Sequence, residues 1–203
     1  MKSLVEINQE HARNATEIML GYEDAKREIT EDMSLPDGAY LDRLTPEQRM
    51  AALREHKAER ADEAYQETRK AYAAEVERYH GELAQRRTHL KERLFKVTGP
   101  DGAAALSRTV TATEGELAAF LDVAIQADNE DLARAVFVAA ERRGAGDVMA
   151  RYFDAVDGEA RSVYAEWVEL PSQEVLGRQV ENIDRVVQPP DYERLMPYAS
   201  ATT

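Results

Sequence analysis

The chain has 203 residues, 43% of them hydrophobic and 32% charged, with a formal net charge of -13 at pH 7. This apolar content is enough for a packed core, and sparse glycine with almost no alternating apolar pattern favours helix over strand. The acidity argues against general nucleic-acid binding, which needs a basic face. Because cysteine is absent, disulfides and cysteine-ligated zinc or iron–sulfur sites are excluded.

The first predicted element is a helix over residues 3–33. Apolar and small residues recur every seven positions from Leu4, with a second line four positions later that includes Tyr22 and Ile29. This spacing predicts an a/d seam that packs against another helix. His11 falls on the seam, where a polar residue most often fixes the register of the pairing; a pH switch is the alternative.

The second predicted helix, over residues 46–97, begins at Thr45, with Pro46 at its first position and Gln48 completing a capping box. The seam of this helix consists of Tyr65, Tyr72, Val76, Tyr79, Leu83, Leu90, Leu94 and Val97. Because the first helix is shorter, folding back covers only part of this seam. We expect the remainder to be an interface, with either the C-terminal domain or a second subunit as its partner.

Shorter elements follow a predicted hinge at 98–112. Thr113 and Glu116 form a capping-box pattern, and Gly144 ends another predicted helix. Short loops make successive helices antiparallel neighbours. The predicted fold is therefore all-α: a long, coiled-coil-like antiparallel helical hairpin (1–97), the hinge (98–112), a four-helix domain (113–170), a C-terminal helix (171–187) and an extended tail (188–203).

One basic cluster lies near the end of the long helix: Arg86, Arg87, Lys91, Arg93 and Lys96. Cations at this place interact favourably with the helix dipole, which is one explanation for them. The alternative is an electrostatic dock for the acidic C-terminal domain, an acidic partner or nucleic acid. Because residues 98–170 carry more acidic than basic side chains, a dock within the protein or between subunits is the more economical of these.

The tail contains four apolar side chains with no means of local burial: Tyr192, Leu195, Met196 and Tyr198. The tail is either disordered or a strap that docks on a neighbour through these residues. Residues 189–192 also match the short PPxY pattern that WW domains bind.

No catalytic pattern emerges. Glu77 and His80 form one Glu-x-x-His pair on a helix, whereas di-iron carboxylate bundles use two such pairs. The sequence has no Gly-rich phosphate loop, nucleophile elbow or His-Glu-x-x-His motif. We therefore expect a protein that is not an enzyme and that has no cofactor or metal; a di-iron enzyme is the remote alternative.

Long acidic helices without cysteine resemble, in architecture alone, the helical morphogenesis proteins of tailed phages, of the scaffolding or head–tail connector type. The resemblance implies a structural subunit of an oligomeric assembly. The expected partners are proteins, as in a homo-oligomer, and neither a membrane nor nucleic acid is expected. Abundant alanine and an excess of arginine over lysine are typical of a GC-rich bacterial or phage genome. The expected location is the cytoplasm of a bacterial or phage-infected cell at synthesis, with a virion as the destination of an assembly subunit. The alternative is a monomeric helical adaptor that binds a partner through residues 113–170.

Overall fold

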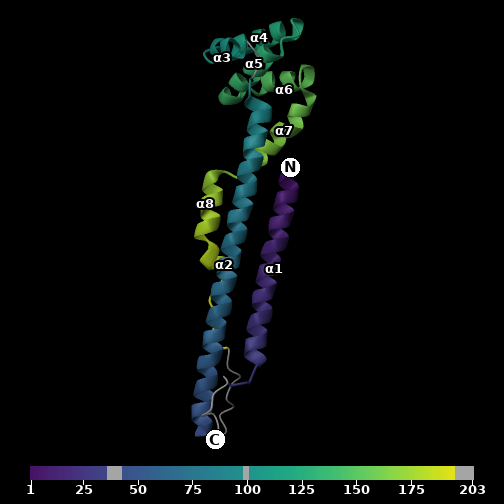
Figure 1. Cartoon of the computed structure of the whole chain (residues 1–203). Helices are drawn as coiled ribbons and strands as arrows, with labels where there is room; N and C mark the ends of the chain where they lie inside the picture. Colours follow the sequence, from purple (N-terminus) through teal and green to yellow (C-terminus); the bar gives the residue numbers. More distant parts are fainter. Residues whose placement is uncertain (36–42, 98–100, 195–203) are drawn as a thin grey trace. The chain divides into compact units, whose positions relative to one another are not determined.

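The computed structural model describes residues 1–35, 43–97 and 101–194 (Figure 1). Its helices are α1 (Leu4–Glu31), α2 (Pro46–Phe95), α3 (Gly102–Thr109), α4 (Glu114–Gln126), α5 (Glu130–Arg143), α6 (Gly146–Ala155), α7 (Gly158–Glu169), α8 (Gln173–Glu181) and α9 (Ile183–Val186). No strand occurs in these described ranges, so the predicted all-α class is confirmed.

The chain divides into two compact units. One contains Leu83–Leu170 together with Met1, and the other contains Lys2–Glu82 together with Pro171–Thr203. We call the first the helical domain and the second the hairpin unit. This division differs from the predicted boundary at residue 97, because α2 contributes its last turns to the helical domain and the C-terminal residues belong with the hairpin.

In the hairpin unit, α1 lies antiparallel beside α2 (Figure 1). The start of α1 meets the later part of α2 through Lys2 and Glu82, whose Nζ and Oε1 atoms are 3.0 Å apart. The end of α1 meets the early part of α2, where Lys57 Nζ donates to the Thr30 carbonyl at 2.6 Å. Ser3 begins α1 with a capping box that Glu6 completes.

The C-terminal arm, residues 171–194, completes the hairpin unit. Three hydrogen bonds set its direction antiparallel to α2: Gln179 with His80 at 3.1 Å, Asp184 with Arg69 at 2.6 Å, and Tyr192 with Asp62 at 2.9 Å. The predicted single helix over 171–187 is instead two shorter ones, interrupted at Asn182. Val187 is completely buried, so the arm is part of this unit's packed structure.

The helical domain is built around α5. All residues of this helix from Ala135 to Ala140 are buried. Phe137 lies at the centre, stacked on Phe95 with ring centroids 5.9 Å apart and on Tyr152 at 4.8 Å. Gly144 ends α5 in the left-handed conformation at φ 69°, as its sequence position predicts.

The predicted hinge at 98–112 is wrong in part, because α3 occupies most of it; residues 98–100 lie outside the described ranges. Ala105 and Thr109 bury one face of this short helix. Gly102 begins it at a point of close approach, where a Cβ would lie only 2.7 Å from Val97 Cγ1. Any side chain there would force Val97 to move.

Candidate functional site

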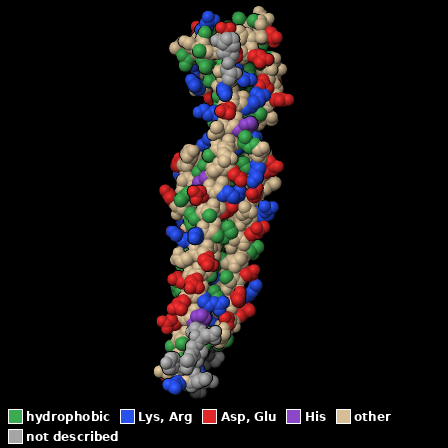
Figure 2. Space-filling view, in the orientation of Figure 1, with side chains coloured by type: hydrophobic (Ala, Val, Ile, Leu, Met, Phe, Trp, Pro, Cys, Tyr) green, Lys and Arg blue, Asp and Glu red, His purple; other side chains and the backbone are tan. Residues whose placement is uncertain are grey.

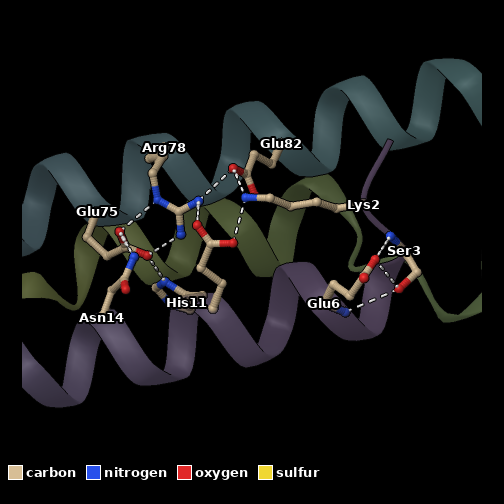
Figure 3. A network of polar contacts seen from close by, with 9 residues as sticks. Lys2, Ser3, Glu6, His11, Asn14, Glu75, Arg78 and Glu82 are labelled. Atoms are coloured by element: carbon tan, nitrogen blue, oxygen red, sulfur yellow. Dashed lines mark hydrogen bonds and ion pairs between the residues drawn. The ribbon is translucent and has the colours of Figure 1, made fainter.

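A polar network joins α1 to α2 inside the hairpin unit (Figure 3). Its centre is Glu75, which is only 7% exposed. His11 Nδ1 lies 2.9 Å from one Glu75 oxygen, and Asn14 Nδ2 donates to the other at 3.1 Å. Arg78, one turn further along α2, donates from Nε and Nη2 to the two oxygens at 2.8 and 2.7 Å. The buried carboxylate is thus surrounded by donors from both helices.

This arrangement keeps Glu75 ionised. Hydrogen bonds from Arg78 outweigh the opposing effect of burial, and with those from His11 and Asn14 they lower the pKa of Glu75 to about 2. The same contact raises the pKa of Arg78 above its usual value. The Glu75 carboxylate and the Arg78 guanidinium therefore compensate each other's charge, as buried charges require.

The His11 ring completes the packing of this region. It stacks on Tyr79 with ring centroids 4.1 Å apart and planes inclined by 13°. The Tyr79 hydroxyl donates to Asn8 Oδ1 at 2.9 Å. These contacts place His11 where a register-fixing residue is expected. Shifting α1 along α2 would separate the imidazole from both the tyrosine ring and Glu75.

The network continues toward the start of α1. Lys2 Nζ contacts Glu10 at 2.6 Å and Glu82 at 3.0 Å, and Arg78 Nη1 donates to the same Glu82 oxygen at 2.7 Å (Figure 3). Burial acts to raise the pKa of Glu82, but hydrogen bonds from Lys2 and Arg78 lower it overall. The second oxygen of Glu82, Oε2, is buried and has no hydrogen-bond partner among the described residues.

The chemistry open to this network is limited. Both oxygens of Glu75 are occupied, and the neighbouring cations serve as their donors. Within the described ranges, no group of three His, Asp or Glu side chains could hold a metal ion. His80, of the Glu-x-x-His pair, interacts through Nε2 with Gln179 on the C-terminal arm. This geometry fixes the register of α1 against α2.

The predicted seam from Tyr65 to Val97, called here the α2 seam, is largely covered by the chain itself. Five of its residues are buried, at 2% exposure for Val76, Leu83 and Leu94, 1% for Leu90 and 6% for Tyr79; Tyr65, Tyr72 and Val97 are partly buried. Leu94 and Val97 pack in the core of the helical domain. Of the two partners expected for the remainder of the seam, the structure shows the C-terminal domain for Leu94 and Val97, and the stretch from Val76 to Leu94 is buried within the chain.

The physical reason lies in the C-terminal arm and the helical domain, which cover faces of α2 that α1 does not. Val76 follows Arg69 by seven residues and precedes His80 by four, so these three side chains share one face of α2. Arg69 and His80 bind the arm. On the face visible in Figure 2, acidic, basic and hydrophobic side chains are interspersed among the coloured residues.

Two members of the basic cluster dock within the helical domain. Arg86 donates to both oxygens of Glu166 on α7, at 2.7 and 2.5 Å, and the two side chains are 14% and 20% exposed. Arg93 reaches Asp157 at 3.0 Å. Lys91 and Lys96 are exposed, and Arg87 is half-buried. The structure thus gives Arg86 and Arg93 acidic partners inside the chain.

The predicted tail residues are only partly described. Tyr192 is 46% exposed and its hydroxyl donates to Asp62; Leu195, Met196 and Tyr198 lie outside the described residues. Pro190 is buried, so the described part of the PPxY segment lies against the hairpin. This part contacts its own chain, which differs from both alternatives for the tail, disorder and a strap on a neighbour.

Several residues of these contacts were not identified from the sequence. Glu75 directly precedes a seam position, which is the one signal that could have connected it with His11. Lys57 is 1% exposed, and burial lowers its pKa below the usual value. Its amino group donates to the Thr30 carbonyl in the last turn of α1. No pattern in the sequence distinguishes Lys57 from the exposed lysines.

Comparison with protein-family models, with curated proteins and with solved structures gave no match to this chain. Within the described ranges, no helix combines the length and apolar content needed to cross a bilayer.

Proposed function

We propose that this protein is a non-enzymatic helical adaptor that binds a protein partner through its helical domain. The observation that carries the proposal is the burial of the α2 seam from Val76 to Leu94 within one chain. A covered seam is not available as a subunit interface. The adaptor alternative requires only that one domain presents a surface of its own.

The surface of the helical domain supports this assignment. Val110, Val123 and Val168 are 52%, 54% and 64% exposed. Single exposed apolar residues are ordinary on protein surfaces, but they supply the apolar contacts that partner binding uses. The polar network of the hairpin unit, by contrast, has its central carboxylate fully occupied and supports a scaffolding role for that unit.

A second candidate is an assembly subunit of the tailed-phage morphogenesis type, made in the cytoplasm and incorporated into a virion. One observation favours it: α1 and α2 leave an open groove with Ile18, Ala71 and Ala74 among its lining residues. Small side chains allow another helix to approach closely. A second copy lying in this groove would extend the bundle into an oligomer.

Size-exclusion chromatography with multi-angle light scattering separates the two candidates. A monomer that persists at high protein concentration agrees with the adaptor. A ring or other defined oligomer contradicts it and supports the assembly subunit. Replacing Ala74 by arginine would then dissociate an oligomer built on the α1/α2 groove, whereas Glu77→Arg on the neighbouring exposed surface serves as the charge-altering control.

A further inference from the structure

The helical domain has a groove between α3 and α5 with an apolar floor. Its volume is about 120 Å³. Leu106, Val138 and Ala139 line its interior, and Val110, 52% exposed, stands at its edge. Since a water molecule occupies roughly 30 Å³ of liquid, the groove has room for about four non-hydrogen atoms. That is the size of a leucine side chain beyond its Cα.

Two arginines border the same groove. Arg142 and Arg143 are the last residues of α5, and both are exposed. Arg143 Nη2 donates to the Val110 carbonyl at 2.8 Å, which holds its guanidinium across the end of α3. Arg142 makes no hydrogen bond or ion pair within the described part of the chain. The groove is therefore lined by apolar side chains at its base and by two guanidinium groups at its rim.

The positions of these arginines partly reflect helix stability, because cations at a helix C-terminus interact favourably with its dipole. The positive charge of Arg143 helps to lower the pKa of Glu116. That carboxylate already accepts hydrogen bonds from Thr113 N and Oγ1 in the capping box of α4, at 2.7 and 2.8 Å. Neither arginine thus has a direct carboxylate partner among the described residues. Both guanidinium groups retain donors for an external acid.

We propose that this groove binds an acidic segment of a protein partner, with a leucine-like side chain in the groove and flanking Asp or Glu side chains on Arg142 and Arg143. The inference rests on the proposed adaptor function and names the chemistry of its partner. Successive helical residues point about 100° apart, so the two guanidinium groups diverge. Diverging cations suit carboxylates on both sides of the anchor better than one terminal carboxylate.

The charge balance of the whole chain makes this surface selective. The net charge is -13, so acidic ligands are repelled by most of the protein. Binding of such a segment then depends on the local arginines and on the apolar anchor together. Arginine is well suited to this role because its planar guanidinium forms paired hydrogen bonds with carboxylates.

The test is an NMR titration of the full-length protein with short peptides, monitored by amide chemical shifts. The probe is acetyl-Asp-Leu-Glu-amide. Acetyl-Asn-Leu-Gln-amide removes the charges, acetyl-Asp-Ala-Glu-amide removes the anchor, and N-acetyl-leucine offers a terminal carboxylate instead. We expect the first peptide to shift the amides of Val110, Ala139 and Arg143 with a Kd on the order of millimolar, as suits a ligand of this size. The neutral and alanine peptides should bind at least about tenfold more weakly.

Two surface variants provide the matched comparison. Val110→Glu places a competing carboxylate at the rim and should abolish the shifts, whereas Val123→Glu alters a similarly exposed valine of α4 and should leave them unchanged. Arg142→Ala should weaken binding about tenfold, and Arg142→Lys should restore part of it. Unchanged circular dichroism of each variant shows that the fold is intact.

Three outcomes would overturn the inference: no localised shifts with the acidic peptide, equal binding of its neutral counterpart, or tighter binding of N-acetyl-leucine. Light scattering on the same samples keeps this result separate from the proposed function. A monomer that ignores the peptide contradicts the groove assignment alone. An oligomer whose groove still binds the peptide contradicts the adaptor while leaving the groove assignment in place.

Discussion

The Glu75→Gln variant removes the charge at the centre of the polar network while nearly preserving the size of the side chain. In the folded protein the pKa of Glu75 is about 2, against an ordinary value of 4.5. Each unit of difference corresponds to about 1.4 kcal/mol between the two protonation states. The ionised carboxylate therefore stabilises the hairpin unit by on the order of 3 kcal/mol relative to a neutral group.

The pH dependence of this loss has a definite sign. Because the folded pKa is depressed, the stabilisation is present above pH 4.5 and is lost as the pH falls through about 2. Glutamine resembles the protonated acid, so the difference between the wild type and the variant should be greatest near neutral pH. It should shrink progressively below pH 4.5.

The assay is urea unfolding followed by far-UV circular dichroism at several pH values, with hydrogen exchange of peptides from residues 4–18 and 71–82 to locate the effect. Glu77→Gln is the control, since Glu77 is exposed on the same helix and its replacement should change stability by no more than about 0.5 kcal/mol. If Glu75→Gln costs no more than this control, or if its cost is the same at acidic pH, the network does not stabilise the hairpin as argued.

Further predictions concern the other contacts. Arg86→Glu should destabilise the helical domain by about 3 kcal/mol, because it places two carboxylates against each other in a partly buried site. Adding Glu166→Arg should recover most of the lost free energy of unfolding, measured in urea. No recovery would mean that the loss does not come from this pair. Tyr22→Phe should cost about 1 kcal/mol, since its buried hydroxyl donates to the Gln188 carbonyl at 3.0 Å, and an unchanged melting temperature would contradict this. Deleting residues 188–203 should lower the melting temperature of the hairpin unit and increase its hydrogen exchange, because the deletion removes the Gln188 carbonyl that Tyr22 binds and the buried Pro190. Equal exchange would show that the deleted segment does not stabilise the unit. As the pH rises from the depressed pKa of Lys57 toward its ordinary value of 10.5, the free energy of unfolding of the hairpin unit should increase, because burial favours the neutral amine. That rise should be smaller in Lys57→Met, and identical pH profiles would refute it.

Local signals in the sequence predicted the elements well. The capping box of Thr45 and Gln48 is present, with hydrogen bonds of 2.9 and 3.3 Å, and that of Thr113 begins α4 as expected. These features depend on residues three positions apart. Their geometry is decided by the first turn of the helix, whatever the rest of the chain does.

Contacts between distant segments could not be predicted in the same way. His11 and Glu75 are separated by 64 residues, and which side chain faces the histidine depends on the register of α1 against α2. Spacing by seven shows that a seam exists, but many registers satisfy it. The contact of the C-terminal arm with α2 was missed for a related reason: the arm carries an ordinary amphipathic pattern that does not identify the surface it meets.

Assigning the arm to the hairpin unit also has a consequence for protein synthesis. Residues 2–82 leave the ribosome first, whereas Pro171 and the segment after it are translated about 90 residues later, a delay of roughly 5–20 s at common elongation rates of ~5–20 residues per second. During this interval the surface of the nascent hairpin around Tyr22 and Val76 is exposed, because the C-terminal arm has not yet been made. Premature termination would leave that side permanently bare, which would make such fragments natural clients for chaperones and proteases.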